Sequence, residues 1–255
     1  KWGHVGNMSD VTTDELLRYF SEDEKTKVII MYMEGMKDAR SFFNTAKEVT
    51  PVKPLVVLKV GRSEIGSVAA ASHTGSLAGS DKIFDGAFKQ TGVIRAETVE
   101  ELIDTAKAFT MIDEIKGNRV AILTEAGGPG VIAMDEIGLH DDVKMAKFSK
   151  DTEDKLREVL PAMALISHPD GYVDMTAAAD GPQHAEALEI LLRDEGVDAV
   201  LLLSVPPTFL TPTEIADYVN SKMALAKEYK KPVFACFLAG NWVKDAHIMM
   251  EESGI

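Results

Sequence analysis

The fold is decided by the stretch NRVAILTEAGGPG, residues 118–130. After the polar residues Asn118 and Arg119, residues 120–124 are apolar or β-branched, which is typical of a buried strand. The glycine-rich residues 125–130 then lead into an apolar run over 130–139, with Pro129 near the first helical turn, where proline is tolerated. A strand that passes through a glycine turn into a helix is the repeating unit of parallel α/β proteins.

The same alternation runs through most of the chain, and it predicts an α/β fold with parallel sheets and helices on both faces. Strands are expected over residues 27–33, 54–59, 94–96, 118–124, 199–204 and 232–239. Helices are expected over residues 38–49, 81–91, 98–110, 130–139, 151–159, 183–194 and 213–229.

A charged segment that ends in glycine, residues 113–117, interrupts this alternation and predicts a domain boundary. We therefore expect one domain over residues 1–115 and a second over 116–255. The chain begins with Lys1, and residues 251–255 end where another strand could begin. Both ends thus suggest a fragment of a longer protein.

Composition narrows the classes of function. The net charge is −14 over 255 residues and there is no basic cluster, which argues against nucleic-acid binding. Apolar runs such as 197–206 are too short to cross a bilayer, and the start of the chain does not resemble a signal peptide. The single cysteine, Cys236, lies in an apolar strand, where we expect it in the core. A cytoplasmic protein fits these features.

A histidine in a setting of small residues stands out at residues 71–81, ASHTGSLAGSD. Histidine can act as nucleophile and as base near neutral pH. Glycine-rich turns and the start of the next helix offer backbone N–H groups to an anion, which suggests that His73 carries a phosphoryl group. The alternative is a surface-loop histidine before a helix capped by Ser80. The small and hydroxylated residues that would bind the phosphate are Thr74, Gly75, Ser76, Gly79 and Ser80.

A second candidate phosphate loop is the glycine-rich turn with Gly127, Gly128 and Gly130. Parallel α/β folds bind ligands where a strand turns into a helix, although glycine also serves ordinary tight turns there. With one such loop in each domain, the sequence suggests one anion held between two helix N-termini.

Glu34 follows the first expected strand, and its carboxylate could accept a hydrogen bond from the far imidazole nitrogen of His73. That bond would fix the tautomer and leave the other nitrogen nucleophilic. The alternative is a solvated acid at a strand end. The other histidines, among them His140 and His184, have neither partner carboxylates nor metal-ligand spacing around them in the sequence, so we expect no metal site.

These residues resemble the ADP-forming (NDP-forming) acyl-CoA synthetases, or acetate–CoA ligases, which are relatives of succinyl-CoA synthetase. The resemblance covers nearly the whole chain, and the string HTGSLAGSD is its most specific part. The segments that carry it are KVGRSE at 59–64, SHTGSLAGSD at 72–81, GNMSDV at 6–11, YMEG at 32–35, GVI at 92–94 and EAGGPGV at 125–131.

The resemblance implies two consecutive flavodoxin-like domains and a reversible reaction. An acid, CoA and a nucleoside triphosphate give acyl-CoA, nucleoside diphosphate and phosphate, through an acyl phosphate and a phosphohistidine. By this resemblance His73 is the phosphorylated histidine and Glu34 the glutamate that stabilises it. The loops at 75–80 and 127–130 then match the two helix N-termini that bracket the phosphate.

The family also has a CoA-binding domain and an ATP-grasp domain, which the resemblance places in the same longer chain or in a partner subunit of an oligomer. CoA, ATP/ADP or GTP/GDP and Mg²⁺ are implied as substrates of the whole enzyme, with no tightly bound cofactor. One stretch departs from the family pattern: where Asn-Pro-Val-Asp is usual, residues 167–176 read SHPDGYVDMT. The alternative function is a non-catalytic regulatory or binding module, for example in an acyltransferase fusion.

Overall fold

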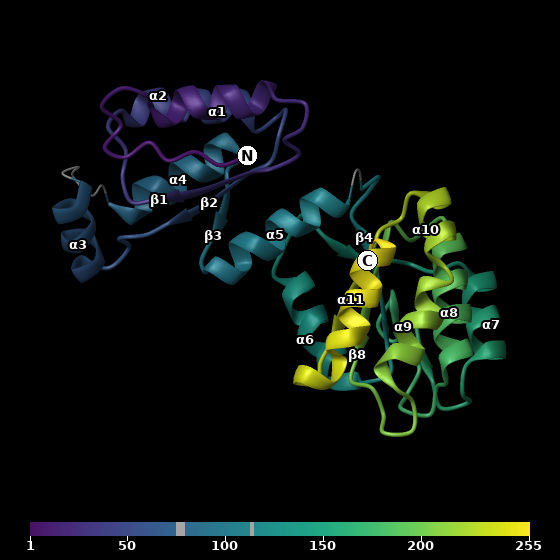
Figure 1. Ribbon diagram of the computed structural model, residues 1–255. Helices are drawn as coiled ribbons and strands as arrows, with labels where there is room; N and C mark the ends of the chain where they lie inside the picture. Colours follow the sequence, from purple (N-terminus) through teal and green to yellow (C-terminus); the bar gives the residue numbers. More distant parts are fainter. Residues whose placement is uncertain (75–79, 113–114) are drawn as a thin grey trace. The chain divides into compact units, whose positions relative to one another are not determined.

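The computed structural model describes residues 1–74, 80–112 and 115–255, and for residues 71–74 it describes the backbone alone. The chain divides into two compact units, Lys1–Asp113 and Glu114–Ile255 (Figure 1). Each unit is built around its own sheet of parallel strands, so the predicted α/β class is confirmed.

The first unit holds a parallel sheet in the order β1-β2-β3, made of β1 (Ile29–Met33), β2 (Leu55–Lys59) and β3 (Ile94–Ala96). The central strand β2 is buried along its whole length, which explains its unbroken apolar sequence LVVL. Met33 pairs with Lys59, and Leu58 with Ala96, so the carboxyl ends of the three strands are aligned at one edge.

Helices cover this sheet on two faces. Leu17, Phe42 and Phe88 join Val57 in one core cluster, so that α1, α2 and α4 share a face, whereas Leu102 of α5 packs with Val56 in another cluster. The helices of this unit are α1 (Thr13–Glu22), α2 (Ala39–Val49), α3 (Glu64–Thr74), α4 (Asp81–Thr91) and α5 (Val99–Met111).

The second unit has a six-stranded sheet in the order β6-β7-β4-β8-β9, with β5 also paired to β4. All described pairings are parallel except that of β6 with β7, which is antiparallel. The strands are β4 (Arg119–Thr124), β5 (Lys144–Met145), β6 (Leu165–Ile166), β7 (Tyr172–Asp174), β8 (Ala199–Ser204) and β9 (Val233–Phe237).

The larger core of this unit joins alternate residues of the central strands, such as Leu123 and Leu202, to Leu188 of α8 and Ile215 of α9. The opposite face of the sheet is covered by α6, whose Met134 packs against Ile122, Tyr172 and Leu203. The helices are α6 (Gly127–Gly138), α7 (Lys150–Val159), α8 (Gly181–Arg193), α9 (Pro212–Asn220), α10 (Met223–Tyr229), the 3₁₀ turn η1 (Gly240–Val243) and α11 (Lys244–Ser253).

Several sequence predictions need correction. Helices α1 and α3 were not predicted, and the helix expected over 213–229 is divided into α9 and α10 because Ser221 and Lys222 lie between them. Residues 251–253 end the helix α11 and do not start a strand. Cys236 is exposed, because β9 is an edge strand.

Within residues 1–74, 80–112 and 115–255, no helix combines the length and the apolar character that a membrane crossing requires.

The amino ends of β4 and β8 are joined by an ion pair between Arg119 and Asp198. The Asp198 carboxylate accepts hydrogen bonds from the Arg119 backbone N (2.9 Å), Nε (2.7 Å) and Nη2 (2.7 Å). These bonds from Arg119 lower the pKa of Asp198 below its ordinary value of 3.8. Because the bond to the backbone N fixes the first residue of β4, the pair helps to hold the two central strands in register.

We expect Asp198→Asn to lower the free energy of unfolding by about 1 kcal/mol, because the amide has no negative charge and offers Arg119 one acceptor oxygen where the carboxylate offers two. A carboxyl whose pKa is lowered by folding stabilises the protein above its unfolded pKa and loses that contribution as the pH falls. The difference between the two proteins should therefore shrink below pH 3.8. Urea unfolding at a series of pH values measures it, with Asp135→Asn on the exposed side of α6 as control. An unchanged difference down to low pH would contradict the assignment.

Candidate functional site

The strongest candidate site in the second unit is the N-terminus of α6, at the carboxyl end of β4. The helix begins at Gly127, three residues earlier than the sequence predicts, so the glycine-rich turn is the first turn of the helix itself. Its N-cap residue is Ala126, which has no side-chain cap. An uncapped first turn presents its N–H groups and the positive end of the helix dipole to an anion.

Two glycines of this turn approach β7 closely. A Cβ on Gly130 would lie 2.6 Å from Cε2 of Tyr172, and one on Gly127 would lie 3.2 Å from Oδ2 of Asp174. A Cβ on Gly128 would meet nothing within 4 Å. The atypical segment 167–176 therefore runs beside the first turn of α6, and glycine at 130 is required by the ring of Tyr172.

Tyr172 and Asp174 form a polar edge to this turn. The Tyr172 hydroxyl donates to Oδ2 of Asp174 at 3.4 Å, and Oδ1 of Asp174 accepts from the backbone N of Thr176 at 2.8 Å. Burial, with the nearby Asp174 charge, raises the pKa of Tyr172 to about 12. The hydroxyl next to Gly130 is therefore a hydrogen-bond donor throughout the physiological pH range.

A buried polar cluster lies just before α6. The Ser204 hydroxyl donates to Oε1 of Glu125 at 2.6 Å, and Nε2 of His184 lies 3.5 Å from Oε2 of Glu125. The expectation that His184 has no partner carboxylate was wrong, as it was for His140, whose Nε2 lies 3.0 Å from Glu136. Sequence spacing could not reveal the cluster, because its residues come from three separate elements. The one signal was an acidic residue directly after a buried strand.

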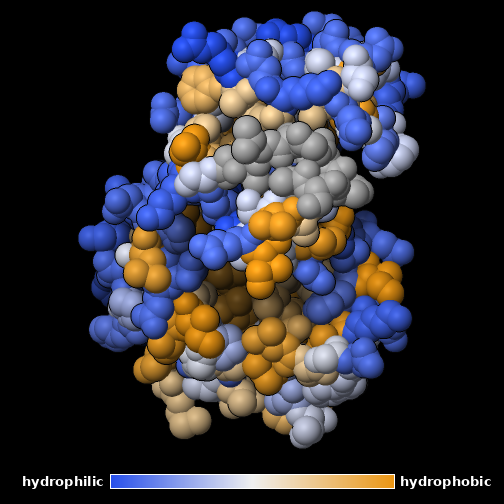
Figure 2. Space-filling view, turned by 90° about the vertical axis from the view of Figure 1, so that its left-hand side faces the viewer, coloured by the Kyte–Doolittle hydropathy of each residue, from blue (hydrophilic) through white to orange (hydrophobic). Residues whose placement is uncertain are grey.

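The outer face of α6 exposes several apolar side chains beside the charged Asp135 and Glu136. Figure 2 shows apolar side chains, in orange, gathered on the side of the molecule where α6 lies in Figure 1. Val131, Ile132 and Leu139 are 53%, 72% and 79% exposed. Exposed apolar side chains that cluster in this way mark an interaction surface.

In the first unit, Glu34 directly follows β1, as the sequence predicts. It is half-buried, and its Oε1 accepts a hydrogen bond from the Tyr32 hydroxyl at 3.2 Å. Burial and the charge of Glu34 raise the pKa of Tyr32. The neighbouring strand β2 ends in Lys59, which is 1% exposed and bonds to the Val60 carbonyl. The Lys59 Nζ lies 4.6 Å from the centre of the Phe84 ring, and burial lowers its pKa.

His73 and Thr74 form the last residues of α3, so the histidine lies in a helical turn and not in the loop that the sequence predicts. Gly75, Ser76 and Gly79 lie outside the described residues. Ser80 is the N-cap residue of α4, but its side chain makes no capping hydrogen bond. The first turn of α4 is therefore also uncapped by a side chain, as is that of α6.

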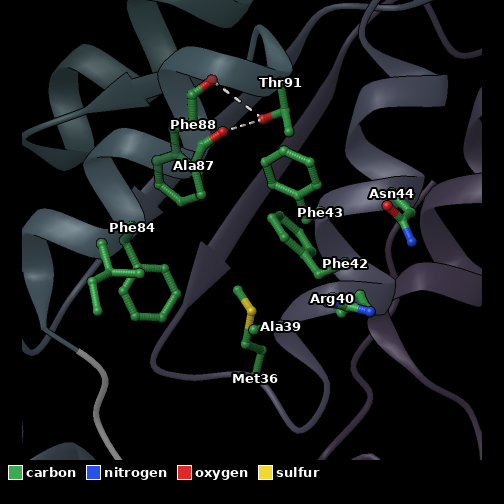
Figure 3. A pocket seen from close by; sticks show the side chains of 11 residues that line it. Met36, Ala39, Arg40, Phe42, Phe43, Asn44, Phe84, Ala87, Phe88 and Thr91 are labelled. Atoms are coloured by element: carbon green, nitrogen blue, oxygen red, sulfur yellow. Dashed lines mark hydrogen bonds between the residues drawn. The ribbon is translucent and has the colours of Figure 1, made fainter.

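A cavity of about 650 Å³ lies between α2 and α4 of the first unit. Figure 3 shows its lining of aromatic side chains, with Phe42 from α2 and Phe84 and Phe88 from α4. The polar Thr91 turns back to its own helix, where its hydroxyl donates to the Ala87 carbonyl at 2.8 Å.

In the part of the chain that the structure describes, no cluster of three or more His, Cys, Asp or Glu side chains could hold a metal ion.

The close contact at Gly130 gives a direct test of the α6 geometry. We expect Gly130→Ala to lower the free energy of unfolding by about 1 to 3 kcal/mol, because the new methyl group overlaps a buried ring. Gly128→Ala is the matched control: it meets open space, and alanine favours helix over glycine by up to about 1 kcal/mol. Urea unfolding of both variants measures the effect. Equal stability of the two variants would contradict the described packing.

Comparisons with known proteins show which family the chain resembles. Residues 1–109 match the family model described as succinyl-CoA ligase like flavodoxin domain. The chain is 45% identical over 259 residues to the alpha subunit of acetate–CoA ligase [ADP-forming] II of Pyrococcus furiosus, covering 100% of this chain and 55% of that subunit. It is 34% identical to 4-hydroxybutyrate–CoA ligase [ADP-forming] of Nitrosopumilus maritimus, covering 92% of this chain and 33% of that protein.

Solved structures also show similarity to acyl-CoA synthetases. The chain superposes with a TM-score of 0.87 and 32% identity on dinucleotide forming acetyl-coenzyme A synthetase 1 of Ca. Korarchaeum cryptofilum, solved with phosphate and ADP, over 98% of this chain and 53% of that one. The chain belongs to the family of ADP-forming acyl-CoA synthetases, as its motifs predict. It spans about half the length of the Pyrococcus alpha subunits that it matches.

Proposed function

We propose that this chain is the central part of an ADP-forming acyl-CoA synthetase and carries the phosphoryl group between two reaction steps. The whole enzyme would convert an acid, CoA and a nucleoside triphosphate reversibly into acyl-CoA, nucleoside diphosphate and phosphate. The observation that carries the proposal is the relationship, along the full chain, to the alpha subunits of ADP-forming acetate–CoA ligases.

In this proposal His73 is the nucleophile. One imidazole nitrogen takes the phosphoryl group from acyl phosphate, releasing the acid, and passes it to the nucleoside diphosphate; the reverse direction retraces these steps. Glu34 would accept a hydrogen bond from the other ring nitrogen and stabilise the positive charge that the ring gains. The position of Glu34 at the carboxyl end of β1 supports this role, because ligands of parallel α/β folds bind at that edge.

The phosphate would be held by helix N-termini. The first turn of α6 has no side-chain cap, and neither does that of α4, so their backbone N–H groups are available to an anion. The residues that we assign to phosphate binding are Thr74, Gly75, Ser76, Gly79, Ser80, Gly127, Gly128 and Gly130. Phosphate and ADP bound to the Korarchaeum relative support an anion site in this family.

The rest of the reaction would use parts that lie outside these residues. CoA, the nucleotide and Mg²⁺ would bind to a CoA-binding domain and an ATP-grasp domain, in the same longer chain or in a partner subunit. The coverage of about half of the Pyrococcus alpha subunit supports further domains, and the exposed apolar side chains of α6 support a contact with them. We propose a cytoplasmic, oligomeric enzyme.

Phosphorylation of His73 is directly testable in the complete protein. Incubation with ATP labelled in the γ-phosphate should give protein-bound label that is lost in acid and kept in base. His73→Ala should abolish the label and the overall reaction. The control is His140→Ala, which removes an exposed histidine that also lies beside a carboxylate. Label that persists in His73→Ala would disprove the assignment.

The role of Glu34 predicts a separate effect. Glu34→Gln should slow phosphorylation of His73 about 100-fold, because a neutral amide stabilises the charged ring poorly. Single-turnover labelling with rapid quenching measures the rate. Tyr32→Phe is the companion variant: it removes the hydroxyl that donates to Glu34 and leaves the carboxylate in place, so its effect should be within about threefold. Equal rates for wild type and Glu34→Gln would contradict the proposal.

A further inference from the structure

The buried cluster before α6 holds two ionisable groups with no assigned role. Glu125 lies between β4 and the N-cap residue Ala126, Ser204 ends β8, and His184 lies in the first turn of α8. The side chains of His184 and Glu125 are 0% and 1% exposed. Glu125 thus ties the turn that leads into α6 to the neighbouring strand and to a helix on the other face of the sheet.

The hydrogen bonds of His184 determine where its protons lie. Its Nδ1 is 2.6 Å from the Asp180 carbonyl oxygen, which can only accept, so Nδ1 carries a hydrogen. Its Nε2 faces Oε2 of Glu125 at 3.5 Å, and neither atom has a hydrogen-bond partner among the described residues. Without a proton between them, a lone pair would face a carboxylate in a buried site, which is costly.

One proton removes this conflict. It gives either an imidazolium beside a carboxylate or a neutral imidazole beside a carboxylic acid, and the pair has no net charge in both cases. Ser204 adds a neutral donor to the other carboxylate oxygen. The cluster can therefore stay buried at the end of the sheet without a net charge.

We infer that Glu125 and His184 hold one proton jointly, and that His184 thereby keeps the buried carboxylate from cancelling the positive end of α6. The inference rests on the proposed binding of phosphate to the first turn of this helix. Glu125 is one residue from the N-cap, and an unpaired carboxylate there would repel a phosphate at the same helix end. His184 is thus a positioning residue, which acts on phosphate through Glu125.

The other charged groups around the cluster do not replace His184. The Asp180 carboxylate caps its own helix, accepting from the backbone N of Gln183 at 2.9 Å. Asp174, beside Gly127, adds negative charge, and the Tyr172 hydroxyl, with a pKa of about 12, is neutral in the physiological pH range. Among the described residues, no other basic side chain forms an ion pair with Glu125.

The test compares the complete wild-type protein with Glu125→Gln, His184→Gln and the double variant. Glutamine at 184 keeps a hydrogen-bond donor and loses the charge. Calorimetric titration with inorganic phosphate measures the affinity of each protein. We expect His184→Gln to weaken phosphate binding about tenfold, and the double variant to restore it to within about threefold, because its amide pair is neutral.

A double variant that binds as weakly as His184→Gln would overturn the inference, and so would wild-type affinity in His184→Gln. If His184→Gln does not fold, a folded double variant supports the inference and an unfolded one contradicts it. Absence of phosphate binding in the wild type would count against the proposed function alone. The melting temperatures still test the pair: His184→Gln should melt about 4 °C or more below the wild type, and the double variant should recover most of the loss.

Discussion

Parallel pairing between β4 and β8 is the constraint on which the second unit depends. The register that pairs Thr124 with Leu203 brings both strands to an end at the same edge, so that Glu125 and Ser204 meet directly beyond it. The pairing of Thr124 with Asp174 brings β7 to the same edge. The turn into α6, the buried Glu125–Ser204 contact and the polar edge formed by Tyr172 and Asp174 therefore all follow from the register of β4 with its two neighbours.

The first unit also has a parallel sheet whose strands end at one edge, and there a buried lysine, Lys59, ends the central strand. Strand β2 is central and fully buried, yet it ends in a lysine. The aromatic ring of Phe84 and the Val60 carbonyl take the place of water around the amine. Burying the Lys59 cation in this way costs folding stability, so stability alone does not explain a lysine at the carboxyl edge of this sheet.

Much of this fold could be predicted from the sequence where the signal is local. The bounds of β3, α4 and β8 agree with the predicted ranges 94–96, 81–91 and 199–204. Each of these elements is flanked in the sequence by glycine, polar or charged residues, which mark where it begins and ends. Helix α3 was missed because its alanine-rich sequence has no apolar stripe. Cys236 was wrongly predicted to lie in the core because an apolar strand has the same sequence pattern at the centre and at the edge of a sheet. The pairing of Glu125 with His184 depends on tertiary packing, which spacing does not encode.

The contact between Tyr172 and Gly130 has a further, evolutionary consequence. The ring occupies the space that a side chain at position 130 would need, so residue 130 cannot grow without a shift or loss of that ring. A side chain at 130 is accommodated without this cost only when the ring at 172 is lost, which also removes the hydroxyl that donates to Asp174. The residue at 172 on β7 therefore limits which residues the first turn of α6 can carry at position 130.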